Sequence, residues 1–178
     1  EEFGPAAFTA KFRAEAMYNF GPSLAPMNAF HILQGLETLP LRMQRHIENT
    51  EKLLKFLTAH EQVSWVRHPS LPEHPQYKLA KKMLPKGAGS IITFGIKGGR
   101  DAGRKFIEAV SLSSHLANVG DAKTLVIHPA STTHSHIDAD AMKSAGLTDD
   151  MIRLSVGLED ISDIVSDFEQ GLKAASKL

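Results

Sequence analysis

The sequence predicts an α/β protein in which helices cover one face of a mixed β-sheet. Three observations support this fold class: a helical first third, short strand-like runs alternating with amphipathic stretches after residue 61, and a strongly amphipathic C-terminal helix. The predicted order is two helical stretches followed by β-α-β-α-β-β-α-β-α, which is typical of an α/β sandwich. With 178 residues, the chain can form one domain with a core, or a small domain with an extension.

The first sixty residues are predicted to be helical. Apolar side chains recur at four-residue spacing, as at Phe8 and Phe12. Predicted breaks fall at Gly21-Pro22 and at Pro40, where proline kinks or interrupts a helix. A helical lead-in of this length cannot easily bury both of its sides. We therefore expect a helical linker with an interdomain helix over residues 1–60, and an α/β domain over residues 61–178.

The elements of the second part follow from hydrophobic periodicity and from the positions of glycine and proline. Strands are expected over residues 63–67, 90–97, 112–116, 124–127 and 151–156. Helices are expected over residues 77–83, 101–110 and 137–145, and along the apolar stripe from Ile161 to Leu172. Acidic residues lie early in this last helix and Lys173 and Lys177 lie late, which matches the helix dipole.

Composition excludes several classes of protein. Twenty basic and twenty acidic residues give no net charge, so nothing favours binding to nucleic acid or to an anionic membrane. The absence of cysteine excludes disulfides, cysteine nucleophiles and thiolate zinc sites, and it fits a reducing compartment. No apolar stretch approaches the roughly 20 residues that span a bilayer. Because the chain begins at Glu1 without methionine, we expect it to be a piece of a longer protein.

One arginine stands in the middle of an otherwise apolar strand. Alternation sends Ile152, Leu154 and Val156 to one face and Arg153 to the other, with Ser155 as its small neighbour. An arginine in such surroundings presents an uncluttered planar fork, which suits a carboxylate or a phosphate. The alternative is a solvated charge on an open sheet face.

A second concentration of polar residues lies between residues 128 and 140, with three histidines and two aspartates. His134 and His136 would face the same way on an extended segment and could share a metal ion with Asp138. Alternatively, Asp138 or Ser135 caps the helix that follows, without any metal. No serine lies in a Gly-x-Ser-x-Gly elbow, and no glycine-rich phosphate loop is present.

Three longer motifs carry a family resemblance. They are GDAKTLVIHPASTTH at residues 120–134, IRLSVGLED at residues 152–160 and LQGLETLPLRMQRHIENT at residues 33–50. Together they resemble the C-terminal portion of the Cys/Met-metabolism family of pyridoxal-phosphate enzymes, over essentially the whole chain from Phe3. The NVGDAKT version, with Asn118, is most similar to O-acetylhomoserine sulfhydrylases. Methionine γ-lyases and cystathionine γ-synthases or lyases are the alternatives within the family.

The resemblance implies the small C-terminal domain of a fold type I enzyme, with a largely antiparallel sheet after a long interdomain helix. It also implies that pyridoxal 5'-phosphate is bound mainly by an N-terminal domain, with the Schiff-base lysine upstream of this chain. The chain would then hold no catalytic residue and would be inactive alone. A cytoplasmic homotetramer is expected for the complete enzyme.

The resemblance also assigns roles to individual residues. Arg153 matches the arginine that binds the α-carboxylate of the amino-acid substrate, and Asn118 matches a residue beside the cofactor. Val119 and Gly120 would bring backbone close to the substrate, and Thr133 would line the pocket for its side chain. The implied reaction is a γ-replacement, in which sulfide or a thiol displaces acetate to give homocysteine or methionine. The rival from another class is a metal-binding module at His134, His136 and Asp138.

Overall fold

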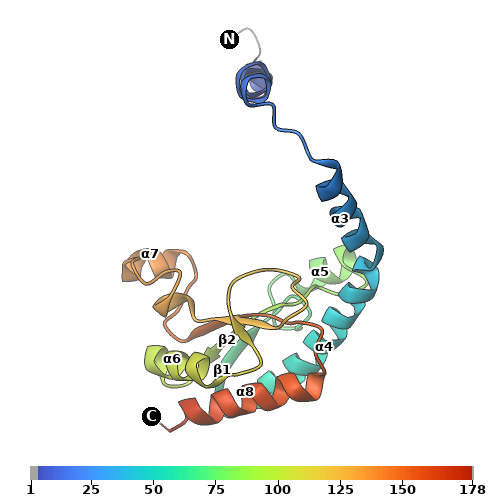
Figure 1. The fold of residues 1–178 in the computed structure, drawn as a ribbon. Helices are drawn as coiled ribbons and strands as arrows, with labels where there is room; N and C mark the ends of the chain where they lie inside the picture. The colour runs from blue at the N-terminus through green and yellow to red at the C-terminus, as the bar shows by residue number, and fades with distance from the viewer. Residues whose placement is uncertain (1–3, 178) are drawn as a thin grey trace. The chain divides into compact units, whose positions relative to one another are not determined.

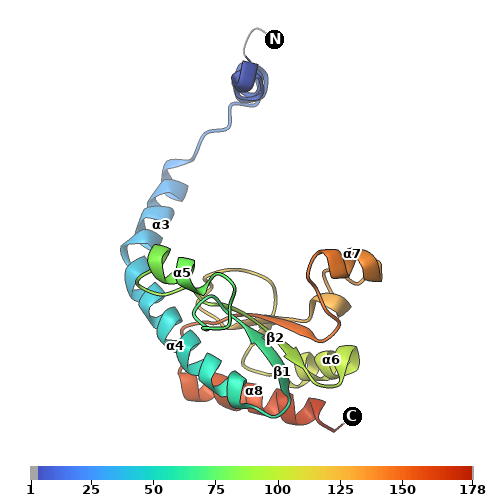
Figure 2. The ribbon, with the colours of Figure 1, turned by 180° about the vertical axis from the view of Figure 1, so that it is seen from behind.

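The computed structural model describes residues 4–177, which divide into two compact units. One unit extends to Leu39, and the other runs from Pro40 onward. Figure 1 and Figure 2 show their elements from opposite sides. Helix α4, Leu39–Ala59, which lies in the region expected to link two domains, therefore belongs almost entirely to the α/β unit.

The first unit is helical, as the sequence predicts. Its elements are a 3-10 turn at Gly4–Ala6, α1 at Ala7–Lys11, a π-helical stretch at Phe12–Met17, α2 at Tyr18–Phe20 and α3 at Pro26–Glu37. Gly21 ends α2 with a φ of 54°, a left-handed conformation that glycine adopts readily. None of these helices contains a buried residue, and Phe8, Tyr18 and Phe20 are more than 80% exposed. Residues 4–39 therefore enclose no core of their own.

The predicted interruption at Pro40 is confirmed. Helix α3 ends at Glu37, Thr38 forms a turn, and α4 begins at Leu39. Pro40 therefore lies in the first turn of α4, where the missing N–H costs no helical hydrogen bond. Further along, α4 buries Leu53 and Leu57 in the core of the α/β unit.

Five strands form one sheet in the order β1-β2-β5-β4-β3. The strands are β1 Val63–Arg67, β2 Ile91–Ile96, β3 Ser114–His115, β4 Leu125–Ile127 and β5 Met151–Ser155. Only the β3 and β4 pair is parallel, so the expectation of a mixed, largely antiparallel sheet is confirmed. The strand expected over residues 112–116 shrinks to two residues, because residue 113 and those before it are engaged by Asp167 instead.

Helices α4, α6 and α8 cover one face of this sheet, as Figure 1 shows from the side. Helix α6 spans Gly99–Ala109 and α8 spans Ile161–Ala175. The rings of Phe94, Phe106 and Phe168 pack edge to face in sequence, with centroids 5.7 and 5.4 Å apart. These rings join β2, α6 and α8 into a single core.

The remaining short elements lie between the strands. They are α5 Tyr77–Met83, the 3-10 turn Pro129–Ser131 and α7 Ala139–Ser144. Helix α7 starts later than the predicted residue 137 because Asp138 is its N-cap and accepts a hydrogen bond from the N–H of Ala141 at 2.8 Å. In residues 4–177, no helix is both long enough and apolar enough to cross a membrane.

Candidate functional site

Arg153 lies at the centre of the sheet. Its strand β5 is paired on one side with β2 and on the other with β4, where Thr93 and Ile127 are its direct partners. Ile152 and Leu154 point into the core, so the predicted alternation is confirmed and Arg153 lies on the opposite face. The side chain is half-buried, which differs from a fully solvated charge.

The guanidinium of Arg153 contacts the loop that precedes β4. Its Nη2 donates a long hydrogen bond of 3.4 Å to the main-chain carbonyl of Asn118. This is the single hydrogen bond that the guanidinium makes within residues 4–177, so most of its five donors remain available. The structure thus brings together Arg153 and Asn118, two residues that lie 35 positions apart.

The loop over residues 118–123 is exposed at its tip. Asn118 Oδ1 accepts a hydrogen bond from the N–H of Val119 at 2.8 Å, and the Val119 side chain is 66% exposed. Gly120 has a φ of 73°, so the loop turns where only glycine is unstrained. The three residues expected near the substrate therefore lie beside Arg153 on an accessible loop.

A carboxylate anchors the far end of this loop. Glu159 accepts hydrogen bonds from the N–H and the hydroxyl of Thr124, at 2.6 and 2.8 Å. The hydroxyl of Thr124 in turn accepts from the N–H of Gly157 at 2.9 Å. Gly157 has no room for a side chain, because an added Cβ would overlap Glu159 and the backbone at Thr124. Hydrogen bonds therefore join the GDAKT motif to the SVGLED motif, and they hold the loop over residues 118–123 near Arg153.

Helix α4 fixes the chain just after β5. Asn49 Nδ2 donates to the carbonyls of Gly157 and Glu159 at 3.0 and 2.9 Å, and His46 Nδ1 lies 2.6 Å from the carbonyl of Val156. Arg45 adds hydrogen bonds to the carbonyls of residues 158 and 159. His46 and Asn49 are fully buried. The RMQRHIEN motif thus fixes the backbone of residues 156–159, which follow Arg153, through side-chain hydrogen bonds.

The second concentration of polar residues, between residues 128 and 140, begins at the buried His128. Its Nε2 lies 2.7 Å from the carbonyl of Asp149, and its Nδ1 lies 2.8 Å from Ser131 Oγ. Because a carbonyl only accepts, Nε2 carries the proton and Nδ1 accepts from the serine hydroxyl. Burial lowers the pKa of His128 below its ordinary value, against the opposing effect of the Asp149 carbonyl, and the charge of Arg100 adds to the shift. The neutral ring therefore links β4 to the turn before β5.

Thr133 lies beyond this linkage and is exposed. Its Oγ1 lies 2.8 Å from His134 Nδ1, and no hydrogen bond joins it to Arg153 or Asn118 in the described part of the chain. The structure therefore groups Arg153 with residues 118–120 and leaves Thr133 on a neighbouring segment.

The metal-binding alternative receives no support. Asp138 caps α7 and His134 pairs with Thr133. Within residues 4–177, no group of three or more histidine, aspartate or glutamate side chains is arranged to hold a metal ion. The helix-capping interpretation of Asp138 is confirmed.

Comparison with known proteins assigns the family. Residues 6–173 match the family described as Cys/Met metabolism PLP-dependent enzyme. The chain belongs to this family. It is 49% identical to the homocysteine synthase of Schizosaccharomyces pombe over 98% of its length, and 48% identical to the O-acetyl-L-homoserine sulfhydrylase of Leptospira meyeri over 97%.

The structural comparison agrees with the family assignment. A Campylobacter jejuni protein assigned as an O-acetylhomoserine (thiol)-lyase, solved with N'-pyridoxyl-lysine-5'-monophosphate, superimposes with a TM-score of 0.83. It is 36% identical, and the match covers 97% of this chain and 41% of that one. The fold is therefore that of these pyridoxal-phosphate enzymes. The chain spans about 40% of the length of the relatives that it matches.

Several residues that build the site are not evident from sequence patterns. Glu159 and Thr124 look like ordinary polar residues in loops, and Asn49 looks like one polar position in an amphipathic helix. Their partners lie between 35 and 110 positions away. The only signal is that all three fall within the motifs that carry the family resemblance, at residues 33–50, 120–134 and 152–160.

Proposed function

We propose that this chain is the C-terminal part of a pyridoxal-phosphate-dependent O-acetylhomoserine sulfhydrylase. The main support is the likeness, along nearly the whole chain, to proteins named homocysteine synthase and O-acetyl-L-homoserine sulfhydrylase. The complete enzyme would replace the acetate of O-acetylhomoserine by sulfide or a thiol, giving homocysteine or methionine. We carry over a cytoplasmic location and a tetrameric assembly from the family resemblance.

Residues 1–60 would serve as the helical linker with the interdomain helix, and residues 61–178 as the small domain. The exposed aromatic side chains between residues 8 and 20 support a linker role for the first unit, because they need a covering surface that the described residues do not provide. The boundary between the two compact units lies at Leu39 and Pro40, and α4 packs into the α/β unit through Leu53 and Leu57. The lysine that carries the cofactor would lie in the part of the enzyme outside this chain, so the chain alone would be inactive.

The residues of this chain fit the carboxylate side of a substrate site. The Arg153 guanidinium has most of its donors free, is half-buried, and faces away from the core next to an accessible loop. Its planar fork would bind the α-carboxylate through two parallel hydrogen bonds and would thereby orient the Cα–H bond. Asn118 and the backbone of Val119 and Gly120 would border the same substrate, and Thr133 would contact its side chain.

Pyridoxal phosphate, when bound, supplies an electron sink for the electrons released as Cα and Cβ lose their protons. The contribution of this chain is binding and orientation. Arg153 would hold the carboxylate in place while acetate leaves Cγ and the sulfur nucleophile adds there. The Glu159–Thr124 and Asn49–Gly157 hydrogen bonds would keep Arg153 and the loop at residues 118–123 in fixed positions.

The test is a product analysis with the full-length enzyme, supplied with pyridoxal phosphate, O-acetylhomoserine and sulfide. We expect homocysteine and acetate in equal amounts. Release of 2-oxobutyrate as the main product would identify a γ-lyase instead. Efficient formation of cystathionine from cysteine, without turnover of sulfide, would identify a γ-synthase.

A further inference from the structure

A second arginine lies on the same face of the sheet as Arg153. Arg67 of β1 pairs with Thr93 of β2, and Thr93 pairs with Arg153 of β5. Paired residues of antiparallel strands project to the same side. With one strand between them, the Cα atoms of the two arginines lie about 10 Å apart. The face opposite the core therefore carries two guanidinium groups in one cross-strand row.

Arg67 is held in place by the single tryptophan of the chain. Its guanidinium carbon lies 5.3 Å from the centroid of the Trp65 ring, within the range of a cation–π contact. The ring is itself fixed, because its Nε1 donates to Asp150 Oδ2 at 2.9 Å. Gly95 provides the space for the ring, since an added Cβ there would overlap Trp65 Nε1. The position of the Arg67 guanidinium is thus set by Trp65, whose ring is in turn held by Asp150.

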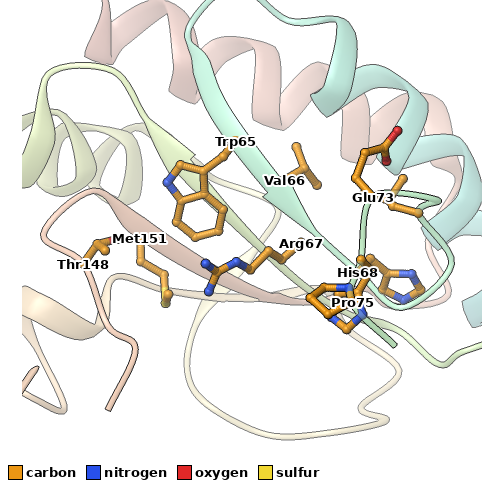
Figure 3. A pocket seen from close by; sticks show the side chains of 10 residues that line it. Trp65, Val66, Arg67, His68, Glu73, Pro75, Thr148 and Met151 are labelled. Atoms are coloured by element: carbon orange, nitrogen blue, oxygen red, sulfur yellow. The ribbon is translucent and has the colours of Figure 1, made fainter. Parts of the chain in front are cut away.

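The donors of Arg67 are unused. In the described residues its guanidinium makes no ion pair and no hydrogen bond, although its plane is already positioned by Trp65. It projects into a pocket of about 620 Å³, whose walls include Trp65, Glu73, His74, Thr148 and Met151. Figure 3 shows the guanidinium below the tryptophan ring, directed toward Met151 and Thr148 and away from Glu73. We call this cavity the Trp65–Arg67 pocket.

We propose that the Trp65–Arg67 pocket binds the carboxylate of a small organic acid with an apolar body. The fork of Arg67 matches a carboxylate, and stacking on Trp65 reduces the rotamer entropy that binding would cost. Met151, Trp65 and Pro75 provide apolar contacts for the rest of the ligand. Glu73 lines the same pocket and disfavours a doubly charged phosphate relative to a singly charged carboxylate. Arg67 is a different group from Arg153, so this site does not depend on the proposed role of Arg153.

The full-length protein provides the test, with the variant Trp65→Phe used to identify the part of the emission that comes from Trp65, the only tryptophan of these 178 residues. Its fluorescence is recorded while hexanoate, acetate or inorganic phosphate is added at constant ionic strength, with chloride as the reference salt. We expect a saturable change of emission with hexanoate, with an affinity about tenfold or more above that for acetate. Phosphate should give no saturable change. A response to phosphate alone, or to no anion, would overturn the proposal.

Substitutions test whether Arg67 is the group that binds the carboxylate of hexanoate. Arg67→Met keeps an apolar stem and should weaken hexanoate binding about tenfold or more, while Arg67→Lys should retain an intermediate affinity. Arg104→Met is the matched control, because Arg104 is an exposed arginine on α6 at a different surface. Equal affinity in the wild-type chain and in Arg67→Met would overturn the assignment. Because the readout requires neither cofactor nor turnover, it is independent of the sulfhydrylase assay.

Discussion

Asn49 of helix α4 donates a hydrogen bond of 3.0 Å to the main-chain carbonyl of Gly157, four residues after Arg153. The second hydrogen of the same amide is directed to the carbonyl of Glu159 at 2.9 Å. Both contacts are made by a side chain that is fully buried. Helix α4 is thereby joined to the backbone that positions the candidate carboxylate-binding arginine.

Replacing Asn49 by alanine should destabilise the α/β unit. The substitution removes the side-chain donor of the Gly157 carbonyl and one of the two side-chain donors of the Glu159 carbonyl, at a cost of about 1–3 kcal/mol in the free energy of unfolding. Asn49→Asp should cost more, because carboxylate oxygens would face carbonyl oxygens. Denaturant unfolding followed by circular dichroism measures both effects, with Gln44→Ala on the exposed side of α4 as the control. Equal denaturation midpoints for Asn49→Ala and Gln44→Ala would show that the hydrogen bonds of Asn49 do not contribute to stability.

Replacing Arg153 by alanine in the full-length enzyme should impair binding of the amino-acid substrate. Loss of charged hydrogen bonds to the α-carboxylate should raise KM by roughly ten- to a hundredfold. The KM of Arg153→Lys should lie between those of the wild-type enzyme and Arg153→Ala, because an ammonium keeps the charge but cannot form two parallel hydrogen bonds to the carboxylate. The visible absorbance of the bound cofactor should be unchanged in both variants. If KM were unaltered in Arg153→Ala, Arg153 would not be the carboxylate-binding residue.

The sequence predicts the fold of this chain well because its strands and helices have clear periods. Ile152 and Leu154 alternate with Arg153, and the stripe of α8 includes Ile164 and Phe168, so the buried faces follow directly. The sheet order cannot be obtained in this way, since β1 and β2 are neighbours whereas β5 lies between β2 and β4. Strand order depends on contacts between distant segments, which local patterns do not encode.

The candidate site is predicted only in part. The unusual position of Arg153 is visible in the sequence, but its proximity to Asn118 comes from the family resemblance and from the structure. Glu159 and Thr124, which hold the loop in place, have no distinguishing local pattern. Arg67 likewise has no distinguishing local pattern. It becomes a candidate ligand-binding residue only because it contacts Trp65 and lies in the same cross-strand row as Arg153.

Asp167 should make stability depend on acid pH. Burial alone would raise its pKa, but hydrogen bonds from the N–H groups of Ser111, Leu112 and Ser113 outweigh burial and lower the pKa below its usual value. Its contribution is therefore fully present above the unfolded-state pKa of about 4 and is lost as the pH falls through the folded-state pKa.

The variant Asp167→Asn tests this dependence. At neutral pH it should lower the free energy of unfolding by about 1–3 kcal/mol, because an uncharged amide accepts these hydrogen bonds less strongly. The difference from the wild-type chain should shrink as the pH is reduced below about 4. Urea unfolding at a series of pH values measures it, with Asp163→Asn, an exposed position of the same helix, as the control. A difference that stayed constant down to acid pH would rule out the ionised carboxylate as its source.

Gly171 lets helices α6 and α8 approach closely, and Gly171→Ala should destabilise the core. An added Cβ would lie 2.7 Å from Cδ2 of Phe106 and 2.9 Å from Cγ1 of Val110. The Phe106 ring cannot move aside freely because it packs between Phe94 and Phe168. Overpacking of this kind costs about 1–3 kcal/mol, whereas alanine in a helix gains about 0.5–1 kcal/mol over glycine.

The steric term should therefore exceed the helix-propensity term, with a net loss of about 0.5–2 kcal/mol. Ser166→Ala, at an exposed position of the same helix, should stay within about 0.5 kcal/mol of the wild-type chain. The measurement is the shift in the denaturation midpoint of each variant. A stabilised Gly171→Ala would mean that the two helices can separate by a few tenths of an ångström at little cost, so that close packing at Gly171 would not limit the core.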